Sequence, residues 1–190
     1  MRCFVGIRLG VETREALVRA CSAVREADSG WRTEKWVAAD NLHVTVAFLG
    51  EVAPGTAAGL AAAIGRELQG ADPFDLPFVQ LRPVPNARRA TMLWAEFSDP
   101  KGHGAALVAG IGQACSEFDI ALESRAFKPH VTLVRARRPR RAGESVFEAL
   151  AHAGAGVPGF VSVPSVTLFA STLSKGGPSY EVLDEWVFLG

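Results

Sequence analysis

The stretches Leu42–Leu49, LHVTVAFL, and His130–Ala136, HVTLVRA, decide the fold of this chain. Both alternate between polar and apolar side chains, the pattern of a β-strand with one face in a core. On such a strand His43 and Thr45 point to one side and Val44 points to the other. The second stretch repeats the arrangement. Each strand is therefore expected to anchor itself through its aliphatic side chains and to present an imidazole and a hydroxyl on its other face.

The same order of elements surrounds both stretches. A strand at Arg2–Ile7 and a helix precede the first HVT triplet, and strand, helix and HVT strand recur between Met92 and Arg135. One face of the first helix carries Leu17, Ala20, Cys21 and Val24. The other predicted helices are Thr56–Gln69, Gly104–Phe118 and Glu144–Ala151, and the other strands are Phe78–Val84, Thr91–Phe97, Val161–Phe169 and Tyr180–Phe188, the first two of them as a hairpin. This order predicts an α+β fold in which residues 1–190 form a single domain of two intertwined lobes, related by a weak internal repeat, around a central groove.

Composition narrows the partners and the compartment. The chain has 190 residues, 48% of them hydrophobic, which is enough for a buried core. Its formal charge of zero means that any contact with nucleic acid must be local. Cys3, Cys21 and Cys115 lack CxxC spacing and are expected to be buried thiols in a reducing compartment. The apolar start is too short for a signal peptide, and no long apolar run occurs, so we expect a cytoplasmic protein without membrane contact.

Two histidines with two threonines suit phosphoester chemistry. One imidazole can take a proton from water while the other, protonated, gives one to a leaving oxygen. Threonine hydroxyls can donate hydrogen bonds to the phosphate oxygens. A metal site is poorly supported because neither triplet has an acidic or cysteine neighbour on its face, and no GxSxG motif suggests a serine nucleophile. The pattern therefore predicts catalysis without metal or cofactor.

Four segments resemble those of a known family. They are RCFVGI at the start, KWVAADNLHVTVAFLGEV at Lys35–Val52, FKPHVTLVRAR at Phe127–Arg137 and GGPSYEVLDEW at Gly176–Trp186. Together they resemble the two-histidine (2H) phosphoesterase superfamily, and within it the RNA 2′,3′-cyclic phosphodiesterase family, also called 2′-5′ RNA ligase. The resemblance covers nearly the whole chain. It implies a bilobal fold of two pseudo-symmetric antiparallel sheets with outer helices around a central groove.

The resemblance also implies roles for particular residues. His43 would be the proton donor and His130 the proton acceptor, with Thr45 and Thr132 on the phosphate. Relatives commonly have a basic residue just before the Phe of the first motif. Ala47 stands at that place here, on the same predicted face as His43, so a cationic contact with the phosphate is expected to be missing.

Three further side chains are possible substrate contacts. Arg135 follows the second motif and would supply positive charge, although strict alternation turns it away from His130 unless a β-bulge intervenes. Phe48 and Phe127 flank the motifs and could stack on a base. Strand parity nevertheless places Phe48 towards the core, whereas Phe127 is expected in the groove.

Outside the two motifs, charged and histidine side chains have weaker predictions. The densest positive charge is a run of arginines that could guide RNA or form a solvated loop: Arg135, Arg137, Arg138, Arg140 and Arg141. His103 and His152 have no threonine two places later and are expected on the surface.

Three functions remain open. The first is hydrolysis of an RNA-terminal 2′,3′-cyclic phosphate to a 2′-phosphate, and reversible 2′-5′ RNA ligation stays open as a further activity. Its partner would be RNA carrying that end, with no obligate protein partner and a monomeric enzyme. The second is a related phosphodiesterase acting on a small cyclic nucleotide or on ADP-ribose cyclic phosphate. The third, a non-catalytic RNA-binding module, is weaker because such modules present aromatic-rich strands, whereas these strands present His and Thr.

Overall fold

A computed structural model describes residues 1–174 and 177–189 of the chain. Gly176, which opens the tail pattern quoted above, lies outside these residues. The helices and strands follow one another along the chain in this order: β1 (Arg2–Arg8), α1 (Val11–Ala27), α2 (Ser29–Arg32), β2 (Lys35–Trp36), the 3-10 turn η1 (Ala39–Asn41), β3 (His43–Glu51), α3 (Pro54–Glu67), β4 (Phe74–Val84), β5 (Ala90–Phe97), α4 (His103–Ser116), β6 (His130–Arg140), α5 (Glu144–Gly154), β7 (Phe160–Val163), β8 (Ser165–Ser174) and β9 (Gly177–Val187).

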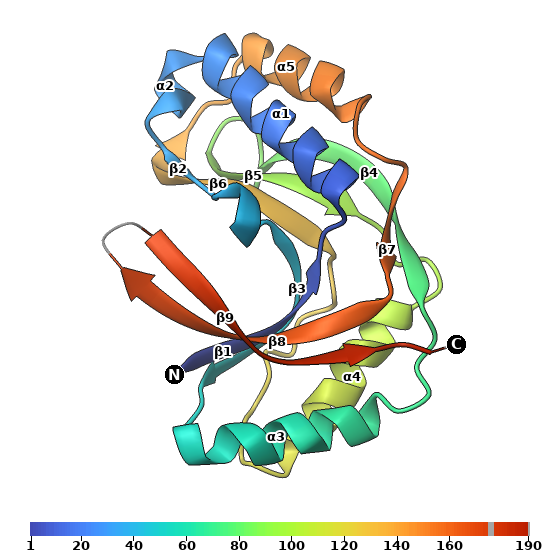
Figure 1. The fold of residues 1–190 in the computed structure, drawn as a ribbon. Helices are drawn as coiled ribbons and strands as arrows, with labels where there is room; N and C mark the ends of the chain where they lie inside the picture. Colours follow the sequence, from blue (N-terminus) through green and yellow to red (C-terminus); the bar gives the residue numbers. More distant parts are fainter. Residues whose placement is uncertain (175–176, 190) are drawn as a thin grey trace.

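Among the described residues the strands form one continuous nine-stranded antiparallel sheet. Its two halves, which we call the sheets of the two lobes, meet at the HVT motifs. In the first lobe the order is β3-β1-β8-β9, and in the second it is β7-β4-β5-β6, with β2 added beside β6. The sheets join where β3 and β6 pair through Val44 and Val131. Figure 1 shows the two sheets curving away from this junction, with the β8–β9 hairpin on one side of the opening and α2–β2 on the other.

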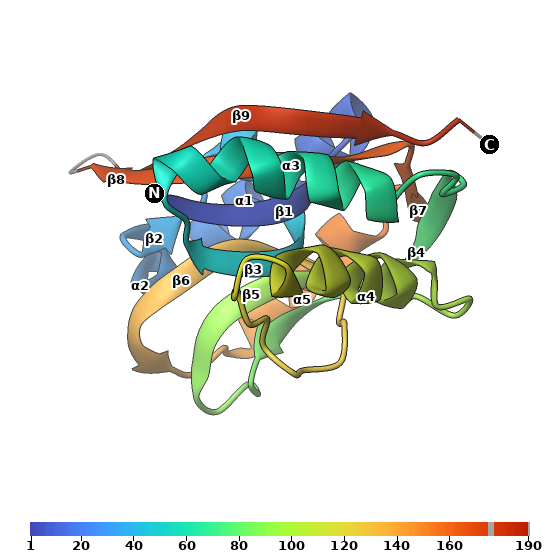
Figure 2. The same ribbon diagram turned by 90° about the horizontal axis from the view of Figure 1, so that it is seen from below.

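The helices lie on the outer faces of the two sheets. Helices α3 and α4 pack on each other outside the first lobe, and α1 and α5 pack on each other outside the second. Helix α1 follows β1 of the first lobe yet covers the second, so the chain crosses between the lobes. Figure 2, seen from below, shows α3 and α4 side by side in front of the strands. The predicted α+β architecture with outer helices is therefore confirmed.

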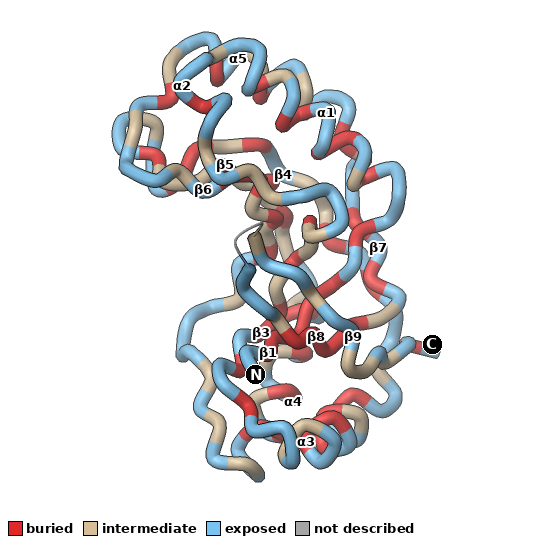
Figure 3. The backbone as a smooth tube through the Cα atoms, turned by 60° about the vertical axis from the view of Figure 1, so that its left-hand side comes forward, coloured by how far each residue is buried: buried red, intermediate tan, exposed pale blue. Residues whose placement is uncertain are grey.

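Apolar side chains explain the layers. The predicted stripe of the first helix is buried, as are the aliphatic side chains that flank His43 and His130. Figure 3 shows buried segments on the inward sides of the helices and along the central strands. Cys3, Cys21 and Cys115 are buried free thiols, as predicted. In the described part of the chain, every helix is too short or too polar to span a bilayer.

One predicted strand proved to be two. Val161–Phe169 was expected as a single strand, but the structure divides it at Pro164 into β7 and β8. Proline has no backbone N–H and so interrupts a ladder. Strand β7 pairs with β4 in the second lobe, whereas β8 pairs with β1 in the first. The break therefore carries the chain from one sheet to the other.

Both HVT strands contain a β-bulge at the same place. Along β3, Thr45 lies opposite Gly6, but the next pair joins Ala47 to Val5, so Val46 is an extra residue. Along β6, Leu133 is the extra residue, in the same place between two ladder pairs. A bulge reverses the alternation of the strand beyond it. Side chains after the triplets therefore point to the opposite side from the one that simple parity predicts.

Candidate active site

A groove of about 1340 Å³ opens at the junction of the two sheets, and all four residues of the HVT pairs line it. His43 and Thr45 come from β3, and His130 and Thr132 come from β6. The two strands run antiparallel, with Val44 opposite Val131. This register brings each histidine level with the threonine of the other strand. The structure thus brings together the four residues that the sequence singled out.

His43 is held at both ring nitrogens. Its Nδ1 lies 2.7 Å from the backbone oxygen of Asn41, and its Nε2 lies 3.1 Å from Oγ1 of Thr45. A carbonyl oxygen can only accept, so Nδ1 carries a hydrogen, and in the neutral ring Nε2 accepts from the Thr45 hydroxyl. Protonation at Nε2 would reverse that hydrogen bond and free the hydroxyl hydrogen for another acceptor.

His130 is held by one hydrogen bond and one ring stack. Its Nδ1 lies 2.7 Å from the backbone oxygen of Lys128. Its ring stacks on the indole of Trp94, with centroids 3.7 Å apart and an interplanar angle of 18°. The carbonyl again assigns the hydrogen to Nδ1, so Nε2 is the position that takes up or releases a proton.

Burial favours the neutral form of both histidines. Burial lowers the pKa of His43, and positive charge on His130 and Arg135 lowers it further, against the hydrogen bond to Asn41 that raises it. Burial also lowers the pKa of His130, as does Arg135, while the hydrogen bond to Lys128 and the Glu96 carboxylate raise it. Negative charge at the site, such as a bound phosphate, would oppose these shifts.

Arg135 faces the groove because of the bulge at Leu133. Its side chain is exposed and lines the groove beside the motif residues, with Nη1 3.2 Å from Sδ of Met92. Simple alternation would have turned Arg135 away from the groove. The β-bulge that the sequence analysis named as the condition for a groove-facing Arg135 is therefore present.

The bulge in β3 corrects two predictions on the first motif. Ala47 does not share the face of His43, because it is buried on the core side at 7% exposure. A basic side chain at that position would therefore point into the core in this structure. Phe48 was placed towards the core by parity, but it is 59% exposed and lines the groove. Phe48 and Arg135 occupy equivalent positions, each five residues after its histidine.

Phe127 was expected in the groove, and this prediction is wrong. Phe127 is half-buried and packs against the core, so close to Gly104 that a Cβ there would collide with its ring. Gly104 lies in α4, so the Phe127 ring packs against that helix. His103 and His152 are exposed, as predicted. His103 stacks on Phe74, with centroids 5.3 Å apart.

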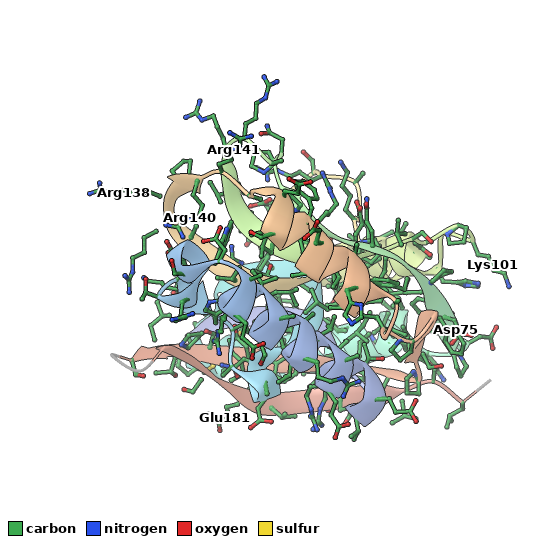
Figure 4. The ribbon with its side chains drawn as sticks, turned by 90° about the horizontal axis from the view of Figure 1, so that it is seen from above. Asp75, Lys101, Arg138, Arg140, Arg141 and Glu181 are labelled. Carbon is green, nitrogen blue, oxygen red and sulfur yellow. The ribbon has the colours of Figure 1, made fainter. Side chains whose placement is uncertain are left out.

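The arginine run divides between the two sides of β6. Arg135 and Arg137 line the groove. Arg140 instead pairs with Glu34 at 3.2 Å and lies over the ring of Trp31. Arg138 and Arg141 extend away from the ribbon (Figure 4).

Sequence reasoning missed three aromatic side chains around the histidines. Trp94 stacks on His130, Phe4 lies 4.8 Å from the His43 ring, and Tyr180 meets that ring edge-on at 5.3 Å. Trp94 lies opposite Thr132 in the β5–β6 ladder. The sequence held an indication of the Trp94 contact, because Trp94 lies within the predicted strand Thr91–Phe97 and that strand needs an antiparallel neighbour. Tyr180 is the single tyrosine of the chain and stood in the quoted tail pattern.

Potential metal ligands do not gather around the histidines. Among residues 1–174 and 177–189, no group of three or more His, Cys, Asp or Glu side chains is placed to hold a metal ion. The charged group beside both imidazoles is instead the Arg135 guanidinium. The local chemistry therefore suits a negatively charged ligand.

Comparisons with known proteins identify the family. The family model described as the 2′-5′ RNA ligase superfamily matches residues 19–170, and the chain belongs to this superfamily. It is 29% identical over 189 residues to the RNA 2′,3′-cyclic phosphodiesterase of Geobacillus stearothermophilus, covering 98% of this chain and 57% of that protein. The chain thus spans little more than half of that relative. The Escherichia coli (strain K12) protein of the same name is 28% identical over 185 residues, covering 97% of this chain and 95% of the relative.

A solved structure agrees with this assignment. The crystal structure of TT0787 of Thermus thermophilus matches with a TM-score of 0.78 and 26% identity, covering 99% of this chain and 98% of that one. The family and the fold that the sequence resemblance implied are therefore confirmed.

Proposed function

We propose that this chain is an RNA 2′,3′-cyclic phosphodiesterase that hydrolyses the cyclic phosphate at an RNA end to a 2′-phosphate, by acid/base catalysis with two histidines and no metal. The observation that carries the proposal is the convergence of both HVT motifs in one groove, with each Nδ1 held by a backbone carbonyl. Both rings thus use Nε2 for proton transfer. The names of the curated relatives support the same activity.

In the proposed reaction His130 is the base and His43 is the acid. Nε2 of His130 removes a proton from water, the water oxygen bonds to phosphorus, and the bond from phosphorus to the 3′ oxygen breaks. Nε2 of protonated His43 donates its proton to that oxygen. The products are a 2′-phosphate and a 3′-hydroxyl. If the 5′-hydroxyl of another RNA replaces water, the same displacement forms a 2′-5′ linkage, and its reversal would be cleavage of that linkage.

The phosphate would be held by three side chains. Thr132 and Thr45 would donate their hydroxyl hydrogens to the non-bridging oxygens, where charge builds up in the transition state. Protonation of His43 releases the Thr45 hydroxyl for this contact, because a protonated Nε2 no longer accepts its hydrogen and instead points its own hydrogen to the 3′ oxygen. Arg135, on the same side of β6 as His130, would supply positive charge.

The size of the groove favours an RNA end over the small substrates of the second hypothesis, a cyclic nucleotide or ADP-ribose cyclic phosphate. Pockets for drug-sized ligands measure about 300 to 1,000 Å³. This groove measures about 1340 Å³ and runs beyond the four motif residues to β2 and the β8–β9 hairpin. Membership of the 2′-5′ RNA ligase superfamily argues against the third reading, a non-catalytic RNA-binding module.

The test is turnover of a short oligonucleotide that ends in a 2′,3′-cyclic phosphate, in the presence of EDTA. We expect hydrolysis to continue, with a product that resists a 3′-specific phosphatase. Activity that disappears with EDTA and returns with a divalent ion would overturn the metal-free mechanism. Phosphate release by the 3′-specific enzyme would reverse the geometry and exchange the roles of the two histidines.

A further inference from the structure

One wall of the groove carries exposed cationic side chains away from the reacting centre. Lys35 on β2 lies opposite Arg135 on β6, so the two share a face, and Arg137 follows two residues later on that face. Arg25 near the end of α1 and Arg32 in α2 continue the line along the groove. We call Arg25, Arg32, Lys35 and Arg137 the cationic wall.

The positive side chains of this wall lack direct carboxylate partners in the described part of the chain. Among the described residues, none of its four side chains forms an ion pair with a carboxylate. The acidic residues that line the groove pair with other arginines: Glu34 is 3.2 Å from Arg140, and Glu123 is 3.4 Å from Arg125. The Glu34 carboxylate also accepts a hydrogen bond from the backbone N–H of Arg137, at 2.8 Å, but it does not pair with the Arg137 guanidinium. Such a concentration of charge stands out in a chain of zero formal charge. It indicates an anionic ligand longer than one phosphate.

The opposite wall has a different character. It comes from the first lobe, and its one cation among the described residues, Arg2, is 4.0 Å from Glu51. The rest of this wall, as far as the structure describes it, is mostly hydroxyl-bearing, apolar and aromatic, with Phe48, Ser171, Leu173, Ser174, Pro178 and Tyr180. Leu173 is 67% exposed and Phe48 is 59% exposed. A groove with cations on one side and exposed apolar surface on the other suits single-stranded nucleic acid, because its phosphates bind cations while its bases stack on apolar and aromatic side chains.

We propose that the cationic wall binds the phosphates of the RNA strand that precedes the reacting end, while its bases face the opposite wall. This inference rests on the proposed function, because it assumes that the cyclic phosphate lies at the HVT motifs. It makes an oligonucleotide, rather than a mononucleotide, the preferred substrate of the site. The four wall residues provide that preference, whereas the residues of the HVT motifs act on both substrates.

The test compares an oligonucleotide that ends in a 2′,3′-cyclic phosphate with the mononucleoside 2′,3′-cyclic phosphate of the same base. The triple variant Arg32→Ala, Lys35→Ala, Arg137→Ala should lower the ratio of their kcat/KM values about tenfold to a hundredfold. The salt dependence of oligonucleotide binding should weaken by about 2 in the slope of log K against log salt, because each lost contact with a single strand is worth about 0.7. Arg138→Ala is the matched control, since Arg138 adjoins Arg137 on β6 but points away from the fold (Figure 4).

Two outcomes overturn the inference. One is a triple variant that is folded by circular dichroism and keeps the wild-type ratio. The other is an equal loss of the ratio in Arg138→Ala, which would show a diffuse charge effect. Fluorescence anisotropy with a labelled oligonucleotide bearing a terminal phosphate needs no turnover, so it tests the wall even if no cyclic phosphate is hydrolysed. Unchanged anisotropy in the triple variant would refute the wall, whereas absent hydrolysis with intact wall-dependent binding would refute only the proposed function.

Discussion

Replacing Trp94 with leucine tests how the proposed base is supported. The indole stacks on the His130 ring at 3.7 Å, so an imidazolium formed there lies against the negative face of a π-system. A cation on an aromatic face gains about 0.5 to 1 kcal/mol at a partly exposed site, which corresponds to a rate factor of about two to five. Leucine also removes the platform that fixes the ring. We therefore expect kcat to fall about tenfold to a hundredfold in total.

Trp94→Phe is the matched variant because it keeps an aromatic face beneath the ring. It should stay within about threefold of wild type. NMR titration of the His130 ring without substrate separates the two effects, because loss of packing alone would expose the ring and raise its pKa. Trp94→Leu should lower the pKa of His130 further, while Glu96 on β5, His43 on β3 and Arg135 on β6 remain in place. A folded leucine variant with the wild-type kcat and an unchanged His130 titration would refute this reasoning.

Three further predictions concern the histidines. His43→Ala and His130→Ala should each lower kcat by about 10² to 10⁴, and the losses should be far from additive in the double variant. Thr45→Ala and Thr132→Ala should each lower kcat by about tenfold to a hundredfold. Near-full activity in a folded histidine variant would contradict the paired roles. Gly6→Ala should lower kcat by displacing the His43 ring, because a Cβ at residue 6 would lie 3.3 Å from its Cδ2. An unchanged crystal position of the ring and unchanged kcat would argue against this. Burial lowers the pKa values of both histidines below the ordinary 6.5, so at lower pH the unfolded chain binds more protons than the folded chain. The free energy of unfolding should therefore be at its full value above pH 6.5. It should fall as the pH drops from there through the pKa values of the two histidines in the folded protein. Urea melts from pH 7.5 to 5 check this, and His43→Gln should flatten the dependence.

The period of two was sufficient to predict the HVT face but not the residues beyond it. His43, Thr45, His130 and Thr132 precede the bulges, so simple alternation places them correctly. Phe48 and Arg135 follow the bulges, and their side was open to error because a bulge depends on the pairing with a neighbouring strand. For Arg135 the sequence indicated only that a β-bulge was needed to turn its side chain towards the groove. The structure shows such a bulge in both strands.

Residues contributed by other strands were beyond reach for a related reason. Trp94 approaches His130 only because β5 pairs with β6 in one register, and Tyr180 approaches His43 only because β9 ends the first sheet beside β8. A one-residue slip would turn either side chain to the opposite face. Phe127 shows the converse, since its position next to His130 in sequence suggested the groove while α4 offers it a close packing site at Gly104.

The differences between the two halves bear directly on the proposed direction of proton transfer. A symmetric pair of imidazoles would have equal affinities for a proton, yet the displacement requires one neutral and one protonated ring. The equivalent ladder positions hold Gly6 opposite Thr45 and Trp94 opposite Thr132. Both rings have an aromatic side chain from a neighbouring strand, but Trp94 stacks closely on His130, at 3.7 Å and 18°, whereas Phe4 is tilted by 32° at 4.8 Å from His43. The closer stack gives an imidazolium at His130 the better contact with an aromatic face. Positive charge on His130 lowers the pKa of His43, whereas Glu96 raises that of His130. As the reaction proceeds, positive charge leaves His43 and appears on His130. The surroundings of both rings favour this direction, which supports His43 as the acid and His130 as the base.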